Sequence, residues 1–265
     1  MVPTSTGART FWQRLVYLRD LLQSLVDRDM KLLYKRSTLG VAWTLISPLL
    51  QLLVFIFIFG VIIKVDIPQY ASYVFCGLLV WNWFNSSLFQ ATGVIINSRP
   101  LVRQPGFPVA MLPIAVTATG LVHLLLSLPV LMLFLLLDGV RLTPWLLCLP
   151  IIQLVQFALT ISIAYVLAGL NVAFRDTQHT LGVVLQLLFY LTPIFYDLKS
   201  IPGKYWFFYG LNPMVHIVTW YRQILLWGVA PDWLAMAIVA VITLLLLPLG
   251  YAVFQRQSAR FVEEL

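Results

Sequence analysis

A cluster of aromatic, amide and hydroxyl side chains lies within a long run of the sequence that carries no charge. The cluster is Trp81-Asn82-Trp83-Phe84-Asn85-Ser86-Ser87, and the uncharged run extends over residues 67–98. Polar side chains inside hydrocarbon require a partner, which is either another helix or a hydrated cavity. Aromatic faces beside amides and hydroxyls can also carry sugar rings along a path without holding any one ring tightly.

We therefore predict a path for a glycan through the hydrophobic part of the protein. Its candidate residues are Trp43, Trp81, Trp83, Phe84, Asn85, Tyr190 and Tyr196. For each aromatic residue taken singly, the alternative is packing between helices or a place in the aromatic belt at the membrane surface.

A basic junction precedes the first long apolar run, in the sequence Tyr34-Lys35-Arg36-Ser37-Thr38-Leu39-Gly40. Ser37 or Thr38 can cap a helix, and Gly40 permits a sharp backbone turn. Exposed amides and cations at a helix start suit an anionic headgroup or a pyrophosphate. The alternative is that Lys35 and Arg36 are the ordinary basic residues of a cytoplasmic helix end.

The composition requires that these residues be positioned by membrane-spanning helices. Of the 265 residues, 61% are hydrophobic and only 10% are charged, and the mean hydropathy is +0.91. A soluble chain carries about 25% charged residues, so a soluble enzyme, a disordered chain and a disulfide scaffold are excluded. We expect an all-α membrane protein.

Uncharged runs about 20 residues long indicate the membrane spans. They predict six spans, at about residues 41–63, 72–96, 111–137, 145–170, 177–196 and 233–254. Between the fifth and the sixth, residues 205–227 are rich in aromatic rings and are interrupted by Asn212-Pro213, which favours a turn. We predict short re-entrant or interfacial helices there rather than a seventh span.

The chain is predicted to divide into a cytoplasmic segment, residues 1–38, and a transmembrane domain, residues 39–265. Within the first segment, Phe11, Leu15, Leu18, Leu22 and Leu25 recur every three or four residues, which predicts an amphipathic helix in the cytoplasmic interface. The segments assigned to the cytoplasm hold 12 of the 17 basic residues and six of the ten acidic ones. This excess places both termini inside.

Charges are absent from all six predicted spans. A proton- or sodium-coupled transporter usually carries an acid within the membrane, and a selective ion channel usually carries a ring of charge. We therefore expect the energy for transport to come from another protein. Two short cytoplasmic connections, residues 98–108 and 171–179, could transmit force from a soluble motor; the alternative is that they are ordinary connecting loops.

Catalytic and metal chemistry find little support in the sequence. His123, His179 and His216 lie in separate segments without the spacing of metal ligands. Asp27 and Asp29 resemble the acid pair of metal-dependent sugar transferases, but no catalytic domain accompanies them. We expect no catalytic residue, no metal site and no cofactor in this chain, and hence no enzyme.

Several motifs, in order along the chain, resemble those of the membrane subunits of ABC polysaccharide exporters. The resemblance extends from about residue 20 to the C-terminus and rests on Arg28-Asp29-Met30-Lys31, Tyr34-Lys35-Arg36-Ser37, Leu39-Gly40, Trp43, Pro48-Leu49, Phe107-Pro108, Leu112-Pro113, Leu170-Asn171-Val172-Ala173-Phe174-Arg175-Asp176-Thr177-Gln178-His179, Leu191-Thr192-Pro193-Ile194-Phe195-Tyr196 and Gly210-Leu211-Asn212-Pro213-Met214.

The resemblance implies a homodimer of six-helix subunits that works with two ATPase subunits, which bind ATP and magnesium. It implies that a lipid pyrophosphate enters at Lys31, Lys35, Arg36, Ser37, Leu39 and Gly40. It implies that the ATPase is contacted by Arg28, Arg99, Arg103, Gln104 and Phe107. Nucleic acid is not expected as a partner, because the net charge of +7 lies mainly on the cytoplasmic side.

The expected function is export of an undecaprenyl-pyrophosphate-linked polysaccharide, O-antigen first, across the bacterial inner membrane. Teichoic acid and capsule precursors are alternatives within the same family. Two alternatives come from other classes of protein. One is a polyprenyl-linked glycosyltransferase that uses Asp27 and Asp29, and the other is a passive lipid scramblase.

Overall fold

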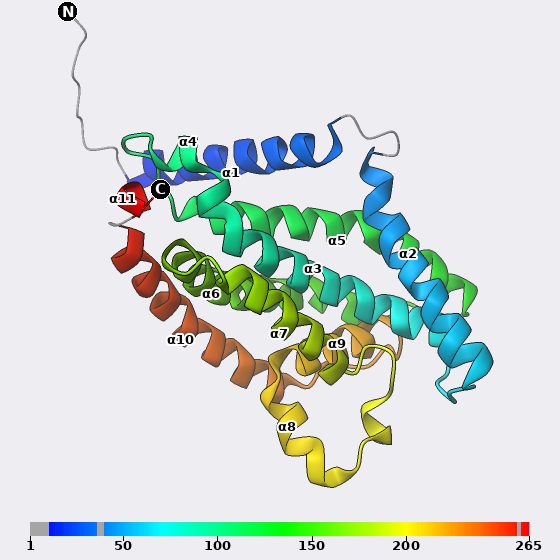
Figure 1. Cartoon of the computed structure of the whole chain (residues 1–265). Coiled ribbons are helices and arrows are strands. Elements are labelled where there is room, and N and C mark those ends of the chain that lie inside the picture. The colour runs from blue at the N-terminus through cyan, green and yellow to red at the C-terminus, as the bar shows by residue number, and fades with distance from the viewer. Residues whose placement is uncertain (1–10, 36–39, 259–260, 265) are drawn as a thin grey trace, which may run out of the picture.

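A computed structural model describes residues 11–35, 40–258 and 261–264, and this part of the chain is helical without a strand. The helices are α1 (Phe11–Tyr34), α2 (Trp43–Phe55) with its π-helical continuation η2 (Ile56–Ile62), α3 (Tyr70–Asn97), α4 (Arg99–Val102), α5 (Met111–Leu137), α6 (Leu149–Ala173), α7 (Thr177–Leu191), α8 (Trp206–Leu211), α9 (Pro213–Leu225), α10 (Trp233–Ser258) and α11 (Phe261–Glu264). In Figure 1, α1, α4 and α11 lie at one end of the molecule and α8 lies at the other.

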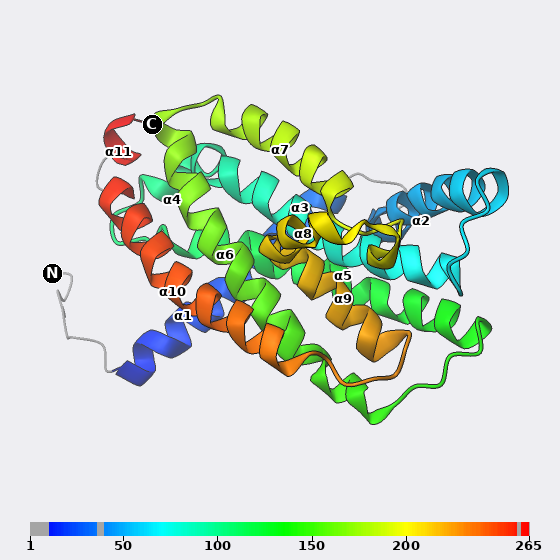
Figure 2. The ribbon, with the colours of Figure 1, turned by 90° about the horizontal axis from the view of Figure 1, so that it is seen from below.

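The centre of the bundle is α3, which packs against α5 and α6 and also contacts α2, α7 and α9. Its apolar side chains, among them Phe75, Leu78 and Ile95, are fully buried. The second major packing is that of α10 along α6 (Figure 2). Gly250 of α10 makes this contact close, because a Cβ at that position would lie 2.4 Å from the backbone oxygen of Ser162 in α6.

Four helical segments in the described chain are long and apolar enough to cross a membrane: Trp43–Ile62, Met111–Leu137, Pro144–Ala173 and Trp233–Ser258. They correspond to the predicted first, third, fourth and sixth spans. The second predicted span lies in α3, which has 28 residues but also holds the polar cluster that lowers its hydropathy. The six-span count stays a prediction.

The fifth predicted span is shorter than expected. Its helix, α7, has 15 residues and ends at Leu191, five residues before the predicted end. Because Pro193 has no backbone N–H and disfavours a helical conformation at Thr192, the helix cannot continue. A helix of this length rises about 22 Å, which is less than the roughly 30 Å of a hydrocarbon core.

Residues 206–225 form two short helices, α8 and α9, that meet at Asn212-Pro213. The Asn212 side chain accepts a hydrogen bond from the backbone N–H of Met214 at 3.0 Å, and Pro213 occupies the first turn of α9. These are preferred residues for a helix start. The aromatic side chains of α8, including Phe207 and Phe208, are exposed.

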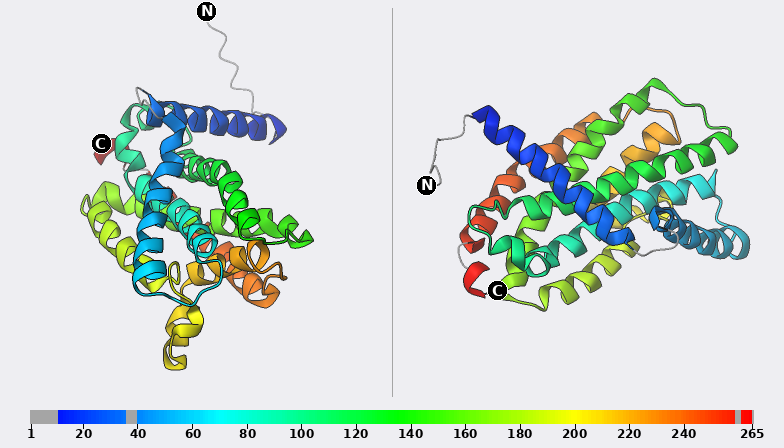
Figure 3. Two further views of the ribbon diagram at one scale, coloured as in Figure 1. Left: turned by 90° about the vertical axis from the view of Figure 1, so that its right-hand side faces the viewer. Right: turned by 90° about the horizontal axis from the view of Figure 1, so that it is seen from above.

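The N-terminal segment contains the long helix α1, which lies across the end of the bundle and contacts α5 (Figure 3). Leu25 is buried, and Leu18 and Leu22 pack against the core. Phe11 and Leu15, the first members of the predicted apolar stripe, are exposed. The stripe therefore packs on the bundle over its second half.

Candidate functional site

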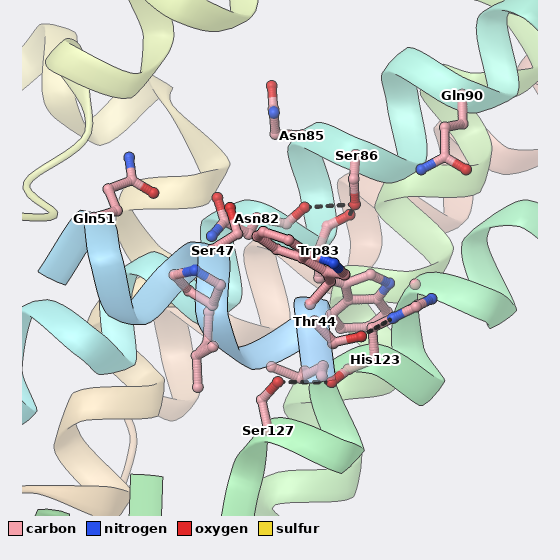
Figure 4. Close-up of a pocket in the computed structure, with 15 residues that line it drawn as sticks. Thr44, Ser47, Gln51, Asn82, Trp83, Asn85, Ser86, Gln90, His123 and Ser127 are labelled. Atoms are coloured by element: carbon pink, nitrogen blue, oxygen red, sulfur yellow. Dashed lines mark hydrogen bonds between the residues drawn. The ribbon is translucent and has the colours of Figure 1, made fainter. Parts of the chain in front are cut away.

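A cavity rich in polar side chains lies between α2, α3 and α5, at the middle of α3 (Figure 4). It has a volume of about 500 Å³. Its polar lining residues are Thr44, Ser47, Gln51, Asn82, Asn85, Ser86, Gln90, His123 and Ser127, and Trp43 and Trp83 add aromatic rings. None of the described residues that line it is an aspartate, glutamate, lysine or arginine.

Helical periodicity brings these side chains together. Residues three or four apart share one face of a helix, and each of the three helices presents such a stripe to the cavity. The stripes are Thr44, Ser47 and Gln51 on α2, Asn82, Ser86 and Gln90 on α3, and Gly120, His123 and Ser127 on α5.

Some of the polar groups are already bonded within the protein. The Ser86 hydroxyl donates to the backbone oxygen of Asn82 at 2.6 Å. The Trp83 indole donates to the backbone oxygen of Thr117 at 3.1 Å. Thr44 Oγ1 lies 3.0 Å from His123 Nδ1. These bonds hold the walls of the cavity in place.

Four amide side chains differ from these groups. Gln51, Asn82, Asn85 and Gln90 make no side-chain hydrogen bond to another described residue, and they lie around the cavity in Figure 4. Each amide offers both a donor and an acceptor. A neutral wall that combines free amides with indole rings suits a ligand rich in hydroxyl groups, since sugars offer both hydroxyls and apolar ring faces.

A second cavity of about 380 Å³ adjoins the first, because Gln51, Asn82 and Asn85 line both. It lies between α2, α3 and α7, and it adds Trp81, Phe89, Gly182, Leu185, Gln186, Phe189 and Tyr190. A third cavity of about 570 Å³ shares Gln90 with the first and Phe89 with the second, and it extends to Arg28 of α1 and Pro100 of α4. We call these three adjoining cavities the α3 groove.

A further cavity of about 710 Å³ lies on α1 next to the α3 groove, and Arg28 and Leu32 line both. The α1 cavity is charged, with Asp27, Arg28, Lys31 and Lys35 around it. A series of adjoining cavities therefore leads from a charged surface at one end of the molecule to a neutral, polar surface at its middle.

The structure brings five of the seven predicted glycan-path residues to the α3 groove. Trp43, Trp83 and Asn85 line the first cavity, and Trp81, Asn85 and Tyr190 line the second. The other two lie apart from it. Phe84 borders an apolar cavity beside α8 that shares only Trp81 with the second cavity, and the hydroxyl of Tyr196 donates to the backbone oxygen of Tyr190 at 2.8 Å.

Sequence reasoning did not single out several polar residues of the groove. They are Thr44, Ser47, Gln51, Gln90, His123, Ser127 and Gln186. Their signal was present as polar residues at helical spacing inside apolar runs, but only the crossing of the three helices shows that the stripes face one another.

The predicted pyrophosphate residues lie partly in the described chain. Lys31 and Lys35 line the α1 cavity, and Gly40 begins the next helical turn with a φ of +50°, a conformation that glycine adopts without strain. Arg36, Ser37 and Leu39 lie outside the described residues. Lys31 and Lys35 are thus brought together with Arg28, which sequence reasoning had assigned to the ATPase contact.

The predicted ATPase-contact residues gather at the end of the molecule where α1 and α4 lie. Arg99, Arg103 and Gln104 are exposed, whereas Phe107 is half-buried against the core. The guanidinium of Arg28 forms an ion pair with Asp29, with 2.7 Å between Nη2 and Oδ1. Asp29, one of the two acids considered for sugar transfer, is therefore engaged by its neighbour.

Apolar helices long enough to cross a membrane surround a polar groove whose first two cavities are lined by no charged residue among those described, and this arrangement defines a membrane transport subunit. The chain belongs to the ABC-2 type transporter family, whose model matches residues 20–226. The family resemblance drawn from the sequence motifs is thereby confirmed.

Curated relatives cover nearly the whole chain. It is 33% identical over 255 residues to the O-antigen export system permease protein RfbA of Myxococcus xanthus. The matched region covers 96% of this chain and 98% of the relative. A protein of the same name from Klebsiella pneumoniae is 31% identical, over 94% of this chain and 96% of the relative. The polysialic acid transport protein KpsM of Escherichia coli is 26% identical, over 89% and 93%.

Proposed function

We propose that this chain is the transmembrane subunit of an ATP-driven exporter of an undecaprenyl-pyrophosphate-linked polysaccharide of the O-antigen class. The observation that carries the proposal is the α3 groove, with its four free amides and its indole rings. Among the described residues, the first two cavities of the groove have a neutral polar lining, which suits a long glycan that must slide, because no fixed charge there holds any one sugar. The names of the relatives at 33% and 31% identity support O-antigen as the cargo.

In this proposal the charged end of the molecule faces the cytoplasm. Lys31 and Lys35 receive the pyrophosphate at the α1 cavity, and the glycan follows through the α3 groove toward the periplasmic side. The exposed Arg99, Arg103 and Gln104 beside α1 contact the ATPase. Both termini are cytoplasmic, and six crossings of the inner membrane are completed by α3 and by α7 together with the segment that follows it, residues 192–196.

The functional unit in this proposal is a homodimer with two ATPase subunits. ATP and magnesium are bound by those partners, since the energy for export must come from outside a chain whose spans carry no charge. Capsule export is the second candidate cargo class, and the relationship to a polysialic acid transport protein favours it over other glycans.

Export by this chain is expected to require ATP hydrolysis by a partner. In a bacterium lacking its own copy of the gene, the chain and its ATPase should restore surface glycan, measured by immunoblot, and an ATPase without its ATP-binding lysine should not. Persistence of surface glycan with the disabled ATPase would instead indicate a passive scramblase. Sugar transfer by the purified chain would indicate a glycosyltransferase, and Asp27→Asn with Asp29→Asn would then abolish it.

Charge reversal at the α1 cavity is expected to impair export at constant protein level. Lys31→Glu combined with Lys35→Glu replaces attraction for a pyrophosphate by repulsion, and we expect export to fall by about tenfold, equivalent to about 1.4 kcal/mol. The assay is surface glycan normalised to the amount of protein in the membrane. Lys199→Glu with Lys204→Glu, which lie near α8, is the matched control. Equal export by the two double variants would refute the role of the α1 cavity.

A further inference from the structure

A buried cation lies in α9, outside the groove. The Arg222 side chain is 2% exposed, and among the described residues it has no ion pair with a carboxylate. Its guanidinium carbon lies 3.4 Å from the centre of the Tyr73 ring in α3. Because burying a charge without compensation is costly, an arginine in this place must be satisfied by other groups.

Backbone oxygens satisfy the guanidinium by accepting its hydrogen bonds. Arg222 Nη1 donates to the backbone oxygen of Pro193 at 2.6 Å, and Nη2 donates to that of Ile194 at 2.7 Å. Longer bonds of 3.4 Å and 3.3 Å join Nε and Nη2 to the backbone oxygen of Tyr73. One guanidinium therefore joins α9 to α3 and to the segment that follows α7.

Two tyrosines of α3 bind the next two backbone oxygens of the same segment. The Tyr70 hydroxyl donates to the oxygen of Phe195 at 3.0 Å, and the Tyr73 hydroxyl donates to that of Tyr196 at 3.0 Å. Four consecutive carbonyl groups, from residues 193–196, are thus bound by three side chains. We call Tyr70, Tyr73 and Arg222 the clamp.

The clamped segment supports the end of α2 that is remote from α1. The Phe195 ring stacks on Phe55 at 5.1 Å between centroids and lies at the same distance from Phe59 of η2. It also contacts Phe189, which lines the second cavity of the α3 groove. Along the rest of its length α2 contacts α3 and α5, but only Pro48 and Leu52 among its residues are buried.

We propose that Arg222 is a positioning residue for transport: the clamp holds residues 193–196 so that Phe195 seats the far end of α2 and thereby sets the width of the α3 groove. The transport role rests on the function proposed above, whereas the seating of α2 does not. Without the guanidinium, the backbone oxygens of Pro193 and Ile194 lose their hydrogen-bond donor, and the interior offers no replacement. Residues 193–196 must then shift to bring these oxygens to other donors. The Phe195 ring then leaves Phe55.

A crosslink from α2 to the end of the clamped segment reads the clamp while both rings are kept. The test uses Val54→Cys, on an exposed position of α2 beside Phe55, with Leu198→Cys, two residues beyond the clamped segment. The native thiols are removed by Cys76→Ala and Cys148→Ala, and the chain is reconstituted in vesicles with its ATPase and treated with a bifunctional thiol reagent. Arg222→Gln is expected to lower the crosslinking yield by about tenfold, the shift expected from losing one hydrogen bond to a charged group. Arg222→Lys, which keeps the charge but not the planar fork, should restore it in part.

A second variant perturbs the clamp without removing the arginine. A Cβ at Gly77 of α3 would lie 2.8 Å from Arg222 Nη2 and 3.3 Å from the Ile194 side chain. Gly77→Ala is therefore expected to displace the guanidinium and to lower the same crosslink. Trp145→Cys with Trp233→Cys, whose rings lie 6.4 Å apart away from the clamp, is the control pair and should crosslink equally in all variants.

An unchanged crosslink at positions 54 and 198 in Arg222→Gln would overturn the proposal. A parallel fall at the control pair would also overturn it, since Arg222 would then serve folding in general. Glycan transport into the vesicles is measured on the same preparations, and we expect it to fall with the crosslink while ATP hydrolysis continues. If the cysteine-pair complex with Arg222 intact crosslinks as expected but transports no glycan, the proposed function fails and the seating of α2 by the clamp stands.

Discussion

Export is expected to fall by at least about tenfold, or about 1.4 kcal/mol, when Ser86 is replaced by tryptophan. Ser86 lines the first cavity of the α3 groove opposite α2 and α5. Its own hydroxyl bonds only to the backbone of α3, so that its loss costs about 1 kcal/mol or less in folding. An indole at this place fills the space that the sugar rings would use.

The surrounding walls leave the new ring little room to move aside. Trp83 is buried and its indole is bonded to the backbone of α5, and Asn82 and Gln90 flank Ser86 by one helical turn on each side. The obstruction therefore stays in the groove.

The measurement is surface glycan per amount of membrane-inserted protein, with Leu245→Trp as the control. Leu245 lies on an exposed face of α10 and is 68% exposed, so that an added indole there meets lipid. Normal export by Ser86→Trp at a normal protein level would exclude the α3 groove as the glycan path. A loss of protein common to both variants would mean that an added tryptophan prevents insertion.

Replacing Gly250 with valine is expected to prevent stable folding. A Cβ at this position would lie 2.4 Å from the backbone oxygen of Ser162 and 3.3 Å from its carbonyl carbon. Backbone atoms of α6 cannot rotate away as a side chain would, and therefore α10 must move outward. Small residues at helix contacts in membranes permit such close approach. We expect the valine to destabilise the folded protein by about 3 kcal/mol through overpacking.

The test of this prediction is the thermal unfolding of the purified protein in detergent, together with the yield of monodisperse material. Gly210→Val is the matched control, because no atom lies within 4 Å of a Cβ built at Gly210 of α8. We expect a large fall in melting temperature for Gly250→Val alone. Equal melting temperatures for the two variants would show that α6 and α10 tolerate a wider separation.

Much of the fold could be predicted because it depends on local properties of the chain. The uncharged runs located the four apolar spans, since each must be long and apolar whatever its neighbours are. Asn212-Pro213 marked the junction of α8 and α9 for a similar reason, because cap residues and proline act on the backbone next to them. The prediction was poorer at α7. Hydropathy alone extends this span to residue 196, whereas Pro193 ends the helix at Leu191.

The site could be predicted only in part. The cluster in α3 was visible because its members are adjacent in the sequence, and Trp83 and Asn85 do line the α3 groove. Phe84, in the same cluster, points elsewhere because neighbouring residues on a helix face different directions. His123 and Gln51 were visible in the sequence only as polar residues inside apolar runs, with no motif beside them.

The sequence by itself determined that this protein resides in a membrane, where its apolar helices lie, and which family it resembles. Hydropathy, charge and motifs are properties of short segments, and they do not depend on how the helices pack. Only the tertiary structure decided that α3 is central, that α2 and α5 face it across a neutral groove, and that Arg222 binds the backbone beyond α7. Those relations join residues as many as 149 positions apart, and they are set by how the helices cross.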